Sequence, residues 1–534
     1  MKKEAGTNIQ ISRLDNKSQQ DIIAIPIMKL IYKSLIKRIL QTNLIKSMKF
    51  IFTLLILIFF ITYSSARDYL ITDFGAVGDG LTNNTSSIQL AINNAWEAGG
   101  GNVVIPKGDF ISGTIFLKSN IQVHFRKGAN LIGSLNPDDY QKVGKWKALI
   151  IAHKTSNVSL IGKGCINGRG SKLALKIDSL FHAGQIDSAD YNFIEKRPKY
   201  YLRPLLIEFL ECDNSIIQGI TLKKSSCWVQ TYELCNNLKI QNITVDSDTY
   251  WNNDGIDIVD CKNVQIYDCD INASDDGICI KSEDWTRERF CDSITIINCS
   301  IRSSASAIKL GSSSVSHMRN ITISNIKVYD TYRSVIAIEA MQGGIVENIC
   351  VENITATNTG NAIFMRIGQI RGAKHPGILR NIVLRKIKVQ VPFDRPDKTY
   401  TIRGPSLPFF HNVFPSSITG IVGYPIESIL LEDIRIIYPG RGTAAYANLP
   451  LNRISDVPEL PTKYPEFSMF GELPAWGFYV RHVEGLKMKN VTIRVKKADY
   501  RPAVVVDDVK DFKFYNLKIK GDKKNDTVFM KNVQ

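Results

Sequence analysis

The sequence predicts an all-β fold in which short parallel strands wind into a β-helix, a single elongated solenoid domain. Three observations lead to this prediction. One motif recurs along most of the chain, its apolar residues alternate as in half-buried strands, and β-branched residues dominate the apolar positions. A chain of 534 residues suits such a stack, because a solenoid adds units without enlarging a round core.

The motif reads Asn or Asp, apolar, any, apolar, any, polar, apolar, any, apolar. Successive clear copies start 23, 26, 29, 28, 28 and 33 residues apart. Each copy gives two short strands joined at a polar corner, where asparagine tolerates left-handed backbone. Leucine-rich repeats, the rival solenoid, would need fixed leucines and a helix in each unit, and the sequence shows neither. Clear copies start at Asn214, Asn237, Asn263, Asp292, Asn320, Asn348 and Asn381, and weaker copies at Asn157, Ser428 and Asn490.

A second column of strands can be aligned beside the motif. Its two outward ladders have neighbouring rungs one coil apart, about 4.8 Å, so a sugar chain can lie across them. The inward positions are Ile256, Ile278, Ile308, Ile336 and Ile363. The outward ladders are Asp257, Cys279, Lys309, Ala337, Phe364 and Val259, Lys281, Gly311, Glu339, Arg366.

The repeat lapses in two Pro-, Gly- and Tyr-rich stretches, residues 391–425 and 439–476. Long loops of this kind are commonly functional, and these two could wall one end of a cleft. Harmless surface insertion is the alternative. The β-helix domain with these two loop insertions is expected to span residues 67–534.

The N-terminus predicts export. Residues 51–62 form an apolar run that follows Lys46 and Lys49 and precedes small residues at 64–66, the layout of a signal peptide. The run is shorter than the ~20 residues of a membrane span. We expect residues 48–66 to be the signal peptide, starting at Met48, and residues 1–47 to be a non-native or disordered extension. A signal anchor in a secretory membrane is the alternative.

Composition restricts the partner. The net charge is +16, of which residues 67–534 carry about +9 once the ten Lys/Arg and three Asp/Glu of residues 1–49 are removed. A basic secreted domain suits a polyanion, although the charge could serve solubility alone. No basic run interleaved with aromatics indicates nucleic acid. Ten Asn-x-Ser/Thr sequons within residues 67–534, among them Asn157, Asn272 and Asn353, permit glycosylation, and some could lie in turns and stay unmodified.

The ten cysteines lie between residues 165 and 350, and several of them occupy equivalent places in successive coils. Cys212, Cys235 and Cys261 form one such series, and either disulfides or a buried ladder of thiols fits one-coil spacing. Cys279 and Cys291 bracket a loop and are the best candidates for a bridge. The absence of a C-x-x-C pair argues against zinc.

Three carboxylates carry the chemistry. Asp254 and Asp276 are 22 residues apart, one coil of the repeat, so Asp254, Asp275 and Asp276 gather at one strand edge. Like charges held together raise at least one pKa, which leaves one carboxyl protonated while another stays ionised. Glycosidic cleavage needs such a pair. A calcium site, or aspartates acting only as turn residues, remains open on spacing alone.

The segment Asn252-Asn-Asp-Gly-Ile-Asp-Ile, with Asp275-Asp276-Gly-Ile one coil later, resembles the N-T-D and D-D motifs of glycoside hydrolase family 28, the polygalacturonases. The stretches that open at Asp73 and Gly99 are similar to the start of that family. The resemblance implies a right-handed β-helix and an inverting hydrolase without metal or organic cofactor. It implies Asp275 as general acid, with Asp254 and Asp276 holding and deprotonating the water, and carboxyls roughly 6.5–9.5 Å apart.

Two family motifs depart from the pattern. The G-H-G position falls on Ala305-Ser306-Ala307, and the R-I-K position falls on Ala337-Ile338-Glu339, so the bases that grip a galacturonate carboxylate are missing. Lys281, Lys309 and Arg366 lie on the same outward face and could substitute, although Arg366 could instead pair with Glu339. The candidate substrate-binding residues are therefore Asn252, Lys281, Ser306, Lys309 and Arg366.

The sequence thus favours a secreted, cell-wall enzyme that hydrolyses an anionic pectic polysaccharide. We expect it to be a monomer without stable membrane association. The substrate could be homogalacturonan, rhamnogalacturonan or xylogalacturonan. Two alternatives stand beside it: a wall-binding protein with weak activity, and a calcium-dependent pectate lyase. The lyase would need an arginine base beside the carboxylates, and no arginine adjoins them in the sequence.

Overall fold

The computed structural model of the protein describes residues 32–34, 36–37, 67–400, 402, 412–444, 449–521 and 527–534. The chain divides into Met1–Ala66 and Arg67–Gln534, and all the strands belong to the second unit. The predictions for residues 1–47 and 48–66, including the apolar run at 51–62, fall almost wholly outside the described residues. Within the described part, no helix has the length and apolarity needed to cross a membrane.

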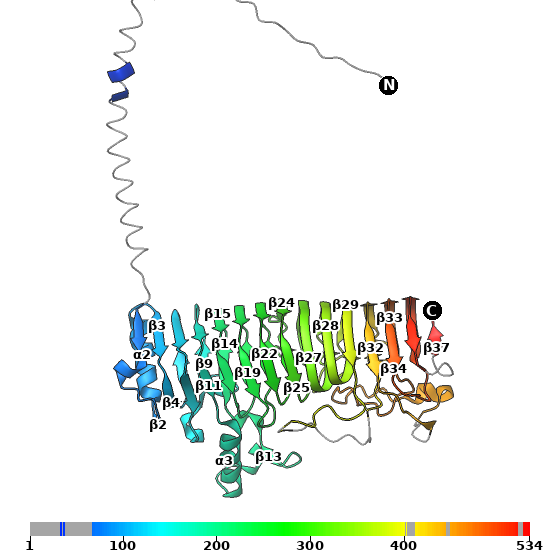
Figure 1. The fold of residues 1–534 in the computed structure, drawn as a ribbon, viewed down its shortest axis with the longest axis horizontal. Coiled ribbons are helices and arrows are strands. Elements are labelled where there is room, and N and C mark those ends of the chain that lie inside the picture. The colour runs from blue at the N-terminus through cyan, green and yellow to red at the C-terminus, as the bar shows by residue number, and fades with distance from the viewer. Residues whose placement is uncertain are drawn as a thin grey trace, which may run out of the picture. The chain divides into compact units, whose positions relative to one another are not determined.

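The second unit is a stack of coils whose strands pair in parallel from each coil to the next (Figure 1). The pairing runs in three columns. The first column begins near the N-terminal end of the unit and continues to its last coils. It comprises β1 (Asp68–Leu70), β3 (Gly101–Ile105), β6 (Ile121–Phe125), β10 (Ser159–Gly162), β15 (Asp213–Gln218), β18 (Asn236–Gln241), β21 (Lys262–Tyr267), β24 (Cys291–Ile297), β27 (His317–Ala340), β28 (Ile345–Ile367), β29 (Ile378–Gln390), β31 (Ile426–Glu432), β33 (Phe478–Lys489) and β35 (Val504–Tyr515).

The second column follows the first across a corner, and the long strands β27, β28 and β29 run through both. Its remaining members are β2 (Asp79–Asn83), β4 (Gly108–Ser112), β7 (Ala129–Gly133), β11 (Cys165–Asn167), β16 (Thr221–Lys223), β19 (Thr244–Ser247), β22 (Asp270–Ala273), β25 (Ser300–Ser303), β32 (Arg435–Tyr438), β34 (Thr492–Val495) and β36 (Lys518–Lys520).

The third column carries the candidate site, and the ends of β27 and β28 and the starts of β33 and β35 belong to it. Its other members are β5 (Ile115–Leu117), β9 (Lys147–His153), β14 (Leu205–Leu210), β17 (Gln230–Glu233), β20 (Ile256–Val259), β23 (Ile278–Ser282), β26 (Ile308–Ser314), β30 (Ser416–Thr419) and β37 (Val528–Val533). Two short antiparallel pairs lie outside the columns: β8 (Gln141–Lys142) on β9, and β12 (Tyr191–Asn192) with β13 (Arg197–Pro198).

The coil register confirms the aligned column. Ile256 pairs with Ile278, and Ile278 with Ile308, and these inward isoleucines are fully buried. The outward pairs Cys279–Lys309 and Glu339–Arg366 are also in register. The register shifts after Ile280 and Leu310, so the expected rung between Lys281 and Gly311 is disturbed. The observed pairing makes the unit all-β and parallel; its right-handed sense stays a prediction.

The asparagine corners take the left-handed backbone that the motif predicts. Asn237 and Asn348 have φ of 56° and 57°, and their side chains bond coil to coil, as in the 3.1 Å bond from Asn237 Nδ2 to Asn214 Oδ1. The copy assigned to Asp292 is one residue out of register, because Ser293 has the φ of 59° and Asp292 pairs with Lys262. The copy begins at Ser293, where a serine stands in place of the usual asparagine, and the aspartate before it gave the shifted start. Sequon asparagines such as Asn353 already donate their amide to the neighbouring coil.

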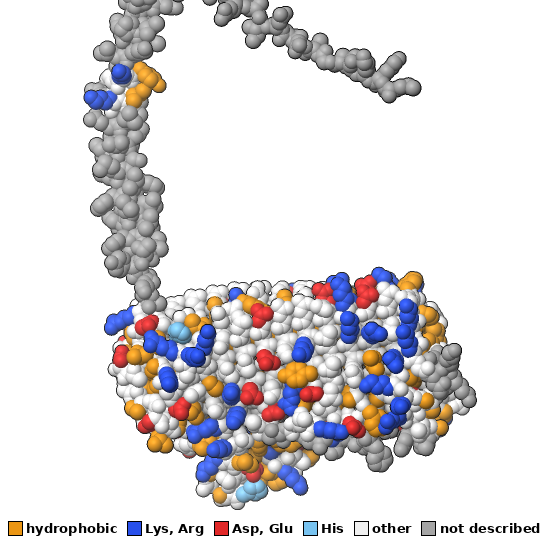
Figure 2. Space-filling model, in the orientation of Figure 1, with side chains coloured by type: hydrophobic (Ala, Val, Ile, Leu, Met, Phe, Trp, Pro, Cys, Tyr) orange, Lys and Arg blue, Asp and Glu red, His pale blue; other side chains and the backbone are white. Residues whose placement is uncertain are grey.

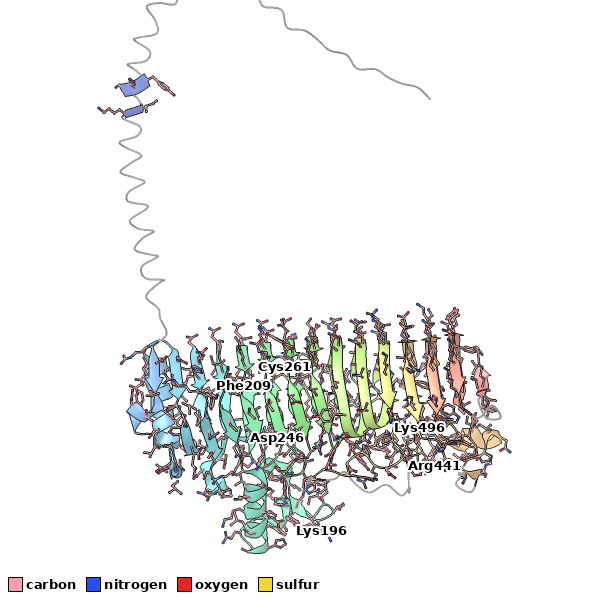
Figure 3. All side chains as sticks on the ribbon, viewed as in Figure 1. Lys196, Phe209, Asp246, Cys261, Arg441 and Lys496 are labelled. Carbon is pink, nitrogen blue, oxygen red and sulfur yellow. The ribbon has the colours of Figure 1, made fainter. Side chains whose placement is uncertain are left out.

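Two helices accompany the coils. Helix α2 (Thr85–Glu97) packs its apolar side, with Ile88 and Ile92 buried, on the first coils. Helix α3 (Gly170–His182) belongs to an insertion that the repeat did not predict, and the insertion protrudes below the stack, with Lys196 at its turn (Figure 3). Short 3-10 helices span Ile71–Phe74, Pro137–Asp139, Ser188–Asp190, Tyr200–Leu202 and Leu451–Asp456.

The second of the two predicted loops packs against the third column. Phe467 and Met469 cover Ala337 and Phe364, two outward rungs, together with Val413 and Phe414 from the first loop. Tyr464 lies beside the candidate site. These contacts favour the interpretation that the two loops wall one end of a cleft over the interpretation that they are harmless surface insertions. The first loop is shorter than expected, because β30 lies inside residues 391–425.

The predicted bridge between Cys279 and Cys291 is wrong, because all ten cysteines are free. Their thiols face different acceptors: the Sγ of Cys279 donates to the carbonyl of Gly311 at 3.3 Å, and that of Cys291 donates to the carbonyl of Lys281 at 3.2 Å. Cys212, Cys235 and Cys261 form the alternative that the spacing allowed, a buried ladder of thiols.

Charge is unevenly spread on the face drawn in Figure 2, where Lys and Arg side chains gather toward the C-terminal coils. The strands there carry Arg435, Lys487, Arg494 and Lys518. A basic surface of this kind agrees with the positive charge of the folded unit and attracts polyanions.

Candidate active site

The three carboxylates lie together at the edge where β20 and β23 begin. Asp254 precedes β20 and Asp275 and Asp276 precede β23, and the nearest oxygens of the three lie within 4.8 Å of one another. The two strands approach closely here, since a Cβ on Gly255 would stand 2.5 Å from the carbonyl oxygen of Gly277. Only glycine therefore fits after Asp254, which explains the Asp-Gly pairs of the sequence.

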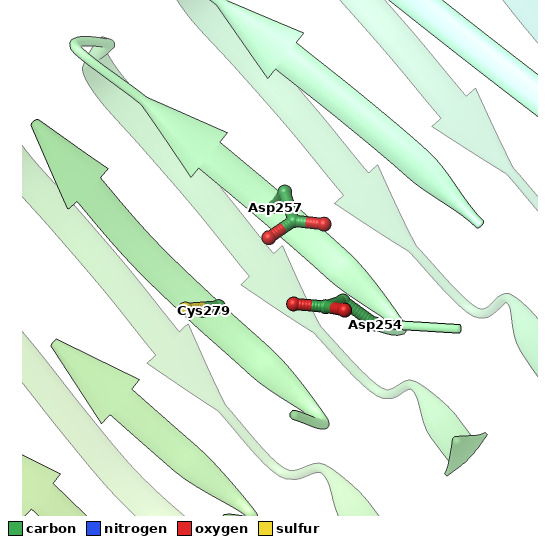
Figure 4. Close-up of side chains that lie close together, drawn as sticks. All are labelled: Asp254, Asp257 and Cys279. Carbon is green, nitrogen blue, oxygen red and sulfur yellow. The ribbon is translucent and has the colours of Figure 1, made fainter. Parts of the chain in front are cut away.

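Lys281 lies between two buried carboxylates of the neighbouring coil. Its Nζ is 3.2 Å from Asp254 Oδ2 and also contacts Asp257 Oδ1. Figure 4 shows Asp254 and Asp257 on the same strand segment, with Cys279 on the next strand. Burial alone would lower the pKa of Lys281, but Asp257 and Asp254 raise it well above its usual value, so the ammonium stays charged.

One ammonium cannot neutralise two buried carboxylates. Burial raises the pKa of Asp254 well above its usual value, and burial raises that of Asp257 to about 6, although Lys281 opposes both shifts. The pair therefore retains a proton at mildly acidic pH. Asp254 Oδ1 is buried and has no hydrogen-bond partner among the described residues, which leaves it able to bind a water.

Asp275 and Asp276 are adjacent but differ in environment. Burial and the charge of Asp276 raise the pKa of Asp275. Burial would also raise the pKa of Asp276, but Lys309 and Arg333 outweigh burial and hold that pKa below its usual value. The Nζ of Lys309 lies 3.2 Å from Asp276 Oδ2. The backbone N–H of Ser306 donates to Asp276 Oδ1 at 3.0 Å and adds to this. The pair thus combines a carboxyl whose pKa is raised with one whose pKa is lowered, a difference that suits an acid and a base.

The structure brings four of the five predicted binding residues to the site. The Nδ2 of Asn252 donates to Asp275 Oδ2 at 3.3 Å, and Lys281 and Lys309 pair with the carboxylates. Ser306 contributes its backbone N–H to Asp276.

The prediction for Arg366 is wrong. Only 1% of its surface is exposed, and its guanidinium donates to the carbonyls of Gly420 and Glu459 beneath the second loop. It also forms no pair with Glu339, which lies 3.9 Å from Lys309 instead.

Sequence reasoning missed several residues of the site. Arg333 is half-buried, pairs with Glu466 at 3.2 Å and acts on Asp275 and Asp276, although it lies outside the repeat motif. Glu339 is buried beside Lys309, and burial raises its pKa to about 8. The sequence predicts Asp257 on the outward ladder but assigns it no role. Its place on that ladder, one coil from Cys279 and two coils from Lys309, is the signal that the sequence offers.

The site opens into a cavity of about 400 Å³. Its walls come from coils on both sides of the carboxylates. The lining residues are Lys145, Trp146, Tyr200, Trp228, Asn252, Asp254, Asp275, Asp276, Lys281, Glu283, Lys309, Gly311, Ser312, Ser313, Arg371 and Tyr464. The volume falls in the usual range of ligand sites, and the three candidate catalytic aspartates line it directly.

Two acidic groups have the spacing for a metal ion: Asp254 with Asp275 and Asp276, and Asp254 with Asp257 and Cys279. Lys281 and Lys309 already contact these carboxylates, and a divalent cation would have to displace or repel the two buried ammoniums. The donor set therefore suits proton transfer better than metal binding.

Comparison with known proteins gives a consistent family. The model for "Glycosyl hydrolases family 28" matches residues 98–388. A "Probable polygalacturonase" of Vitis vinifera is 25% identical over 334 residues, 59% of this chain and 59% of that protein. An "Exo-poly-alpha-D-galacturonosidase" of Dickeya chrysanthemi is 24% identical over 45% of this chain and 47% of its own length. The chain thus spans less than two thirds of these curated relatives.

Two solved structures share the fold. An exopolygalacturonase from Thermotoga maritima matches with a TM-score of 0.55 at 24% identity, covering 70% of this chain and 87% of that one. A family 28 exopolygalacturonase of Yersinia enterocolitica matches with a TM-score of 0.58 at 18% identity, covering 88% of this chain and 78% of that one. At these identities the likeness concerns the fold alone.

Proposed function

Because the chain belongs to glycosyl hydrolases family 28, we propose that it hydrolyses glycosidic bonds of a pectic, galacturonate-containing polysaccharide with inversion at the sugar carbon. One observation carries this proposal. Asp275 and Asp276 line the same cavity with pKa values displaced in opposite directions, which supplies an acid and a base at one place.

The proposed reaction assigns each carboxyl one role. Asp275 donates its proton to the glycosidic oxygen as the bond to the sugar carbon breaks. Asp276 accepts a proton from a water, whose oxygen bonds to the same carbon. Asp254 positions that water through its unpartnered Oδ1. Acid and base end with protonation exchanged, and solvent restores them.

The carboxylate spacing tests the inverting part of this proposal. The nearest oxygens lie within 4.8 Å of one another, closer than the roughly 6.5–9.5 Å expected for inversion. A water at about 2.8 Å from each of two carboxylate oxygens still fits between them, because such a water spans up to about 5.6 Å. If a carboxylate attacked the sugar carbon instead, the product would retain its configuration.

Two alternatives differ in their chemistry. A calcium-dependent lyase would use an arginine as base, and Arg333 lies near Asp275 and Asp276, contrary to the expectation from the sequence. Its pKa is raised, however: burial would lower it, but Glu466 and the aspartates outweigh burial, so Arg333 cannot accept a proton. A wall-binding protein without activity would have no need for two adjacent carboxyls whose pKa values are shifted in opposite directions.

One assay tests the proposal. The folded unit, residues 67–534, is offered a panel of pectic oligosaccharides, with and without calcium, and Asp275→Asn serves as the control. We expect new reducing ends without the ultraviolet absorbance of an unsaturated uronate, and a loss of about 10²–10⁴-fold in Asp275→Asn. Calcium-dependent absorbance would indicate a lyase, and equal activity in Asp275→Asn would refute the site. Secretion to the cell wall belongs to the same proposal and is supported by the signal-like N-terminus, whereas the monomeric state stays a prediction.

A further inference from the structure

Four basic side chains line the cavity, and three of them already contact a carboxylate. Lys145 is 3.2 Å from Glu283, Lys281 is 3.2 Å from Asp254, and Lys309 is 3.2 Å from Asp276. Lys281 and Lys309 each contact a second carboxylate as well, that of Asp257 and that of Glu339. These two ammoniums serve the catalytic aspartates and are not free to bind a uronate.

Arg371 is the exception. It is exposed at the rim, its Nη1 donates to Ser313 Oγ at 3.2 Å, and its guanidinium carbon lies 5.9 Å from the ring centre of Tyr464. Among the described residues it has no carboxylate partner. A guanidinium fork matches a carboxylate in a bidentate manner, so Arg371 is suited to the carboxylate of a sugar acid.

The opposite wall is aromatic and electrically balanced. The ring centres of Trp146 and Trp228 are 4.5 Å apart, those of Trp146 and Tyr200 are 5.2 Å apart, and Tyr200 is 45% exposed. These residues come from coils before the catalytic aspartates, whereas Arg371 and Tyr464 come from segments after them. Two cations among the described lining residues adjoin this wall, and both are paired with carboxylates. Lys145 is neutralised by Glu283, and Lys281, whose Nζ lies 3.6 Å from the ring centre of Trp228, contacts Asp254 and Asp257.

We propose that the cavity binds one uronate carboxylate at Arg371 and places an uncharged sugar against the wall of Trp146, Tyr200 and Trp228. The preferred substrate is then a glycan in which a uronate adjoins a neutral or esterified sugar, with the cleaved bond near the aspartates between them. This inference rests on the proposed function for its substrate class. The inference also accounts for the family bases that are missing at Ser306 and at Ala337-Ile338-Glu339. A substrate with one uronate beside an uncharged sugar needs only one site for a carboxylate.

Binding separates this inference from catalysis. Calorimetry with Asp275→Asn would compare three oligosaccharides of equal length: one fully acidic, one fully methyl-esterified, and one that combines a uronate with uncharged sugars. We expect the mixed ligand to bind most tightly. Adding Arg371→Gln should weaken its binding by about tenfold or more and leave the esterified ligand unchanged. Arg371→Lys should recover only part of the loss, since it keeps the charge but not the fork.

Lys374→Gln is the matched control, because Lys374 is an exposed cation in the same turn that does not line the cavity. A loss equal to that of Arg371→Gln would refute specific recognition, and so would unchanged binding in Arg371→Gln. Tyr200→Ala should weaken the binding of the mixed and the esterified ligand alike. The inference would also be overturned if the fully acidic ligand bound most tightly, or if no ligand bound. Binding that depends on Arg371 without cleavage by the unmodified enzyme would instead refute only the proposed hydrolysis.

Discussion

Lys309 should set the acidic limit of activity. Its Nζ is 3.2 Å from Asp276 Oδ2, and both side chains are buried. Replacing Lys309 with Met keeps an unbranched chain but removes the charge that keeps Asp276 ionised. The pKa of Asp276 should therefore rise, and the acidic limb of kcat/KM should move to higher pH, because the base is then protonated over a wider range.

The structure gives the size of this effect. Two unit charges 3.2 Å apart interact by about 5 kcal/mol at an effective dielectric constant of about 20, which corresponds to nearly 4 pKa units as an upper bound. Arg333 remains and continues to lower the pKa of Asp276. We therefore expect the acidic limb to shift by at least about one unit.

The measurement is a pH profile of kcat/KM for the unmodified enzyme and Lys309→Met, with thermal unfolding to confirm that the variant folds. Glu339→Gln is the matched control. Burial raises the pKa of Glu339 to about 8, so this carboxyl, 3.9 Å from Lys309, is already uncharged at the acidic limb, and the variant should leave the limb in place. An acidic limb that stays in place in Lys309→Met would show that Asp276 is not the base.

Three further outcomes follow from the same contacts. Burial would lower the pKa of His482, but Glu459 and Asp508 raise it above its usual value, so protonated His482 stabilises the folded state. This contribution is complete below the unfolded pKa near 6.5 and is lost as pH rises through the folded pKa. His482→Asn, which tolerates the φ of 53°, should flatten the dependence of Tm on pH, and an unchanged slope would contradict the assignment. Gly277→Ala should destabilise the unit by about 1–3 kcal/mol in urea unfolding, since a Cβ would stand 2.6 Å from the carbonyl of Ala307; a cost near zero would contradict this. A reducing agent should leave Tm unchanged because the cysteines are free, and a fall would reveal a disulfide.

The repeat allowed much of the fold to be predicted. Alternation fixed the inward isoleucines such as Ile278, and one-coil spacing placed Asp254 beside Asp276, because in-register coils convert sequence separation into contact. The slip at Asp292 shows the limit, since the corner residue of that copy is Ser293, and the aspartate before it resembles the usual start of the motif.

Residues that depend on insertions could not be placed in this way. Arg366 is outward on its strand as predicted, but the second loop covers it, and strand alternation does not reveal what packs on top. Tyr464 and Tyr200 reach the cavity from segments without a repeat. Helix α3 had a signal in the spacing of Leu173, Ala174 and Ile177, all buried on one side, which the search for strands passed over.

The most direct test of the central claim, that Asp275 and Asp276 act as acid and base on a water, is the configuration of the first product. Proton NMR recorded immediately after the enzyme meets a cleavable pectic oligosaccharide reports the anomer of the new reducing end before it equilibrates. The account predicts the inverted anomer, absent in Asp275→Asn. A retained anomer would show that a carboxylate attacks the sugar, and an unsaturated uronate would show elimination; either result would contradict the account.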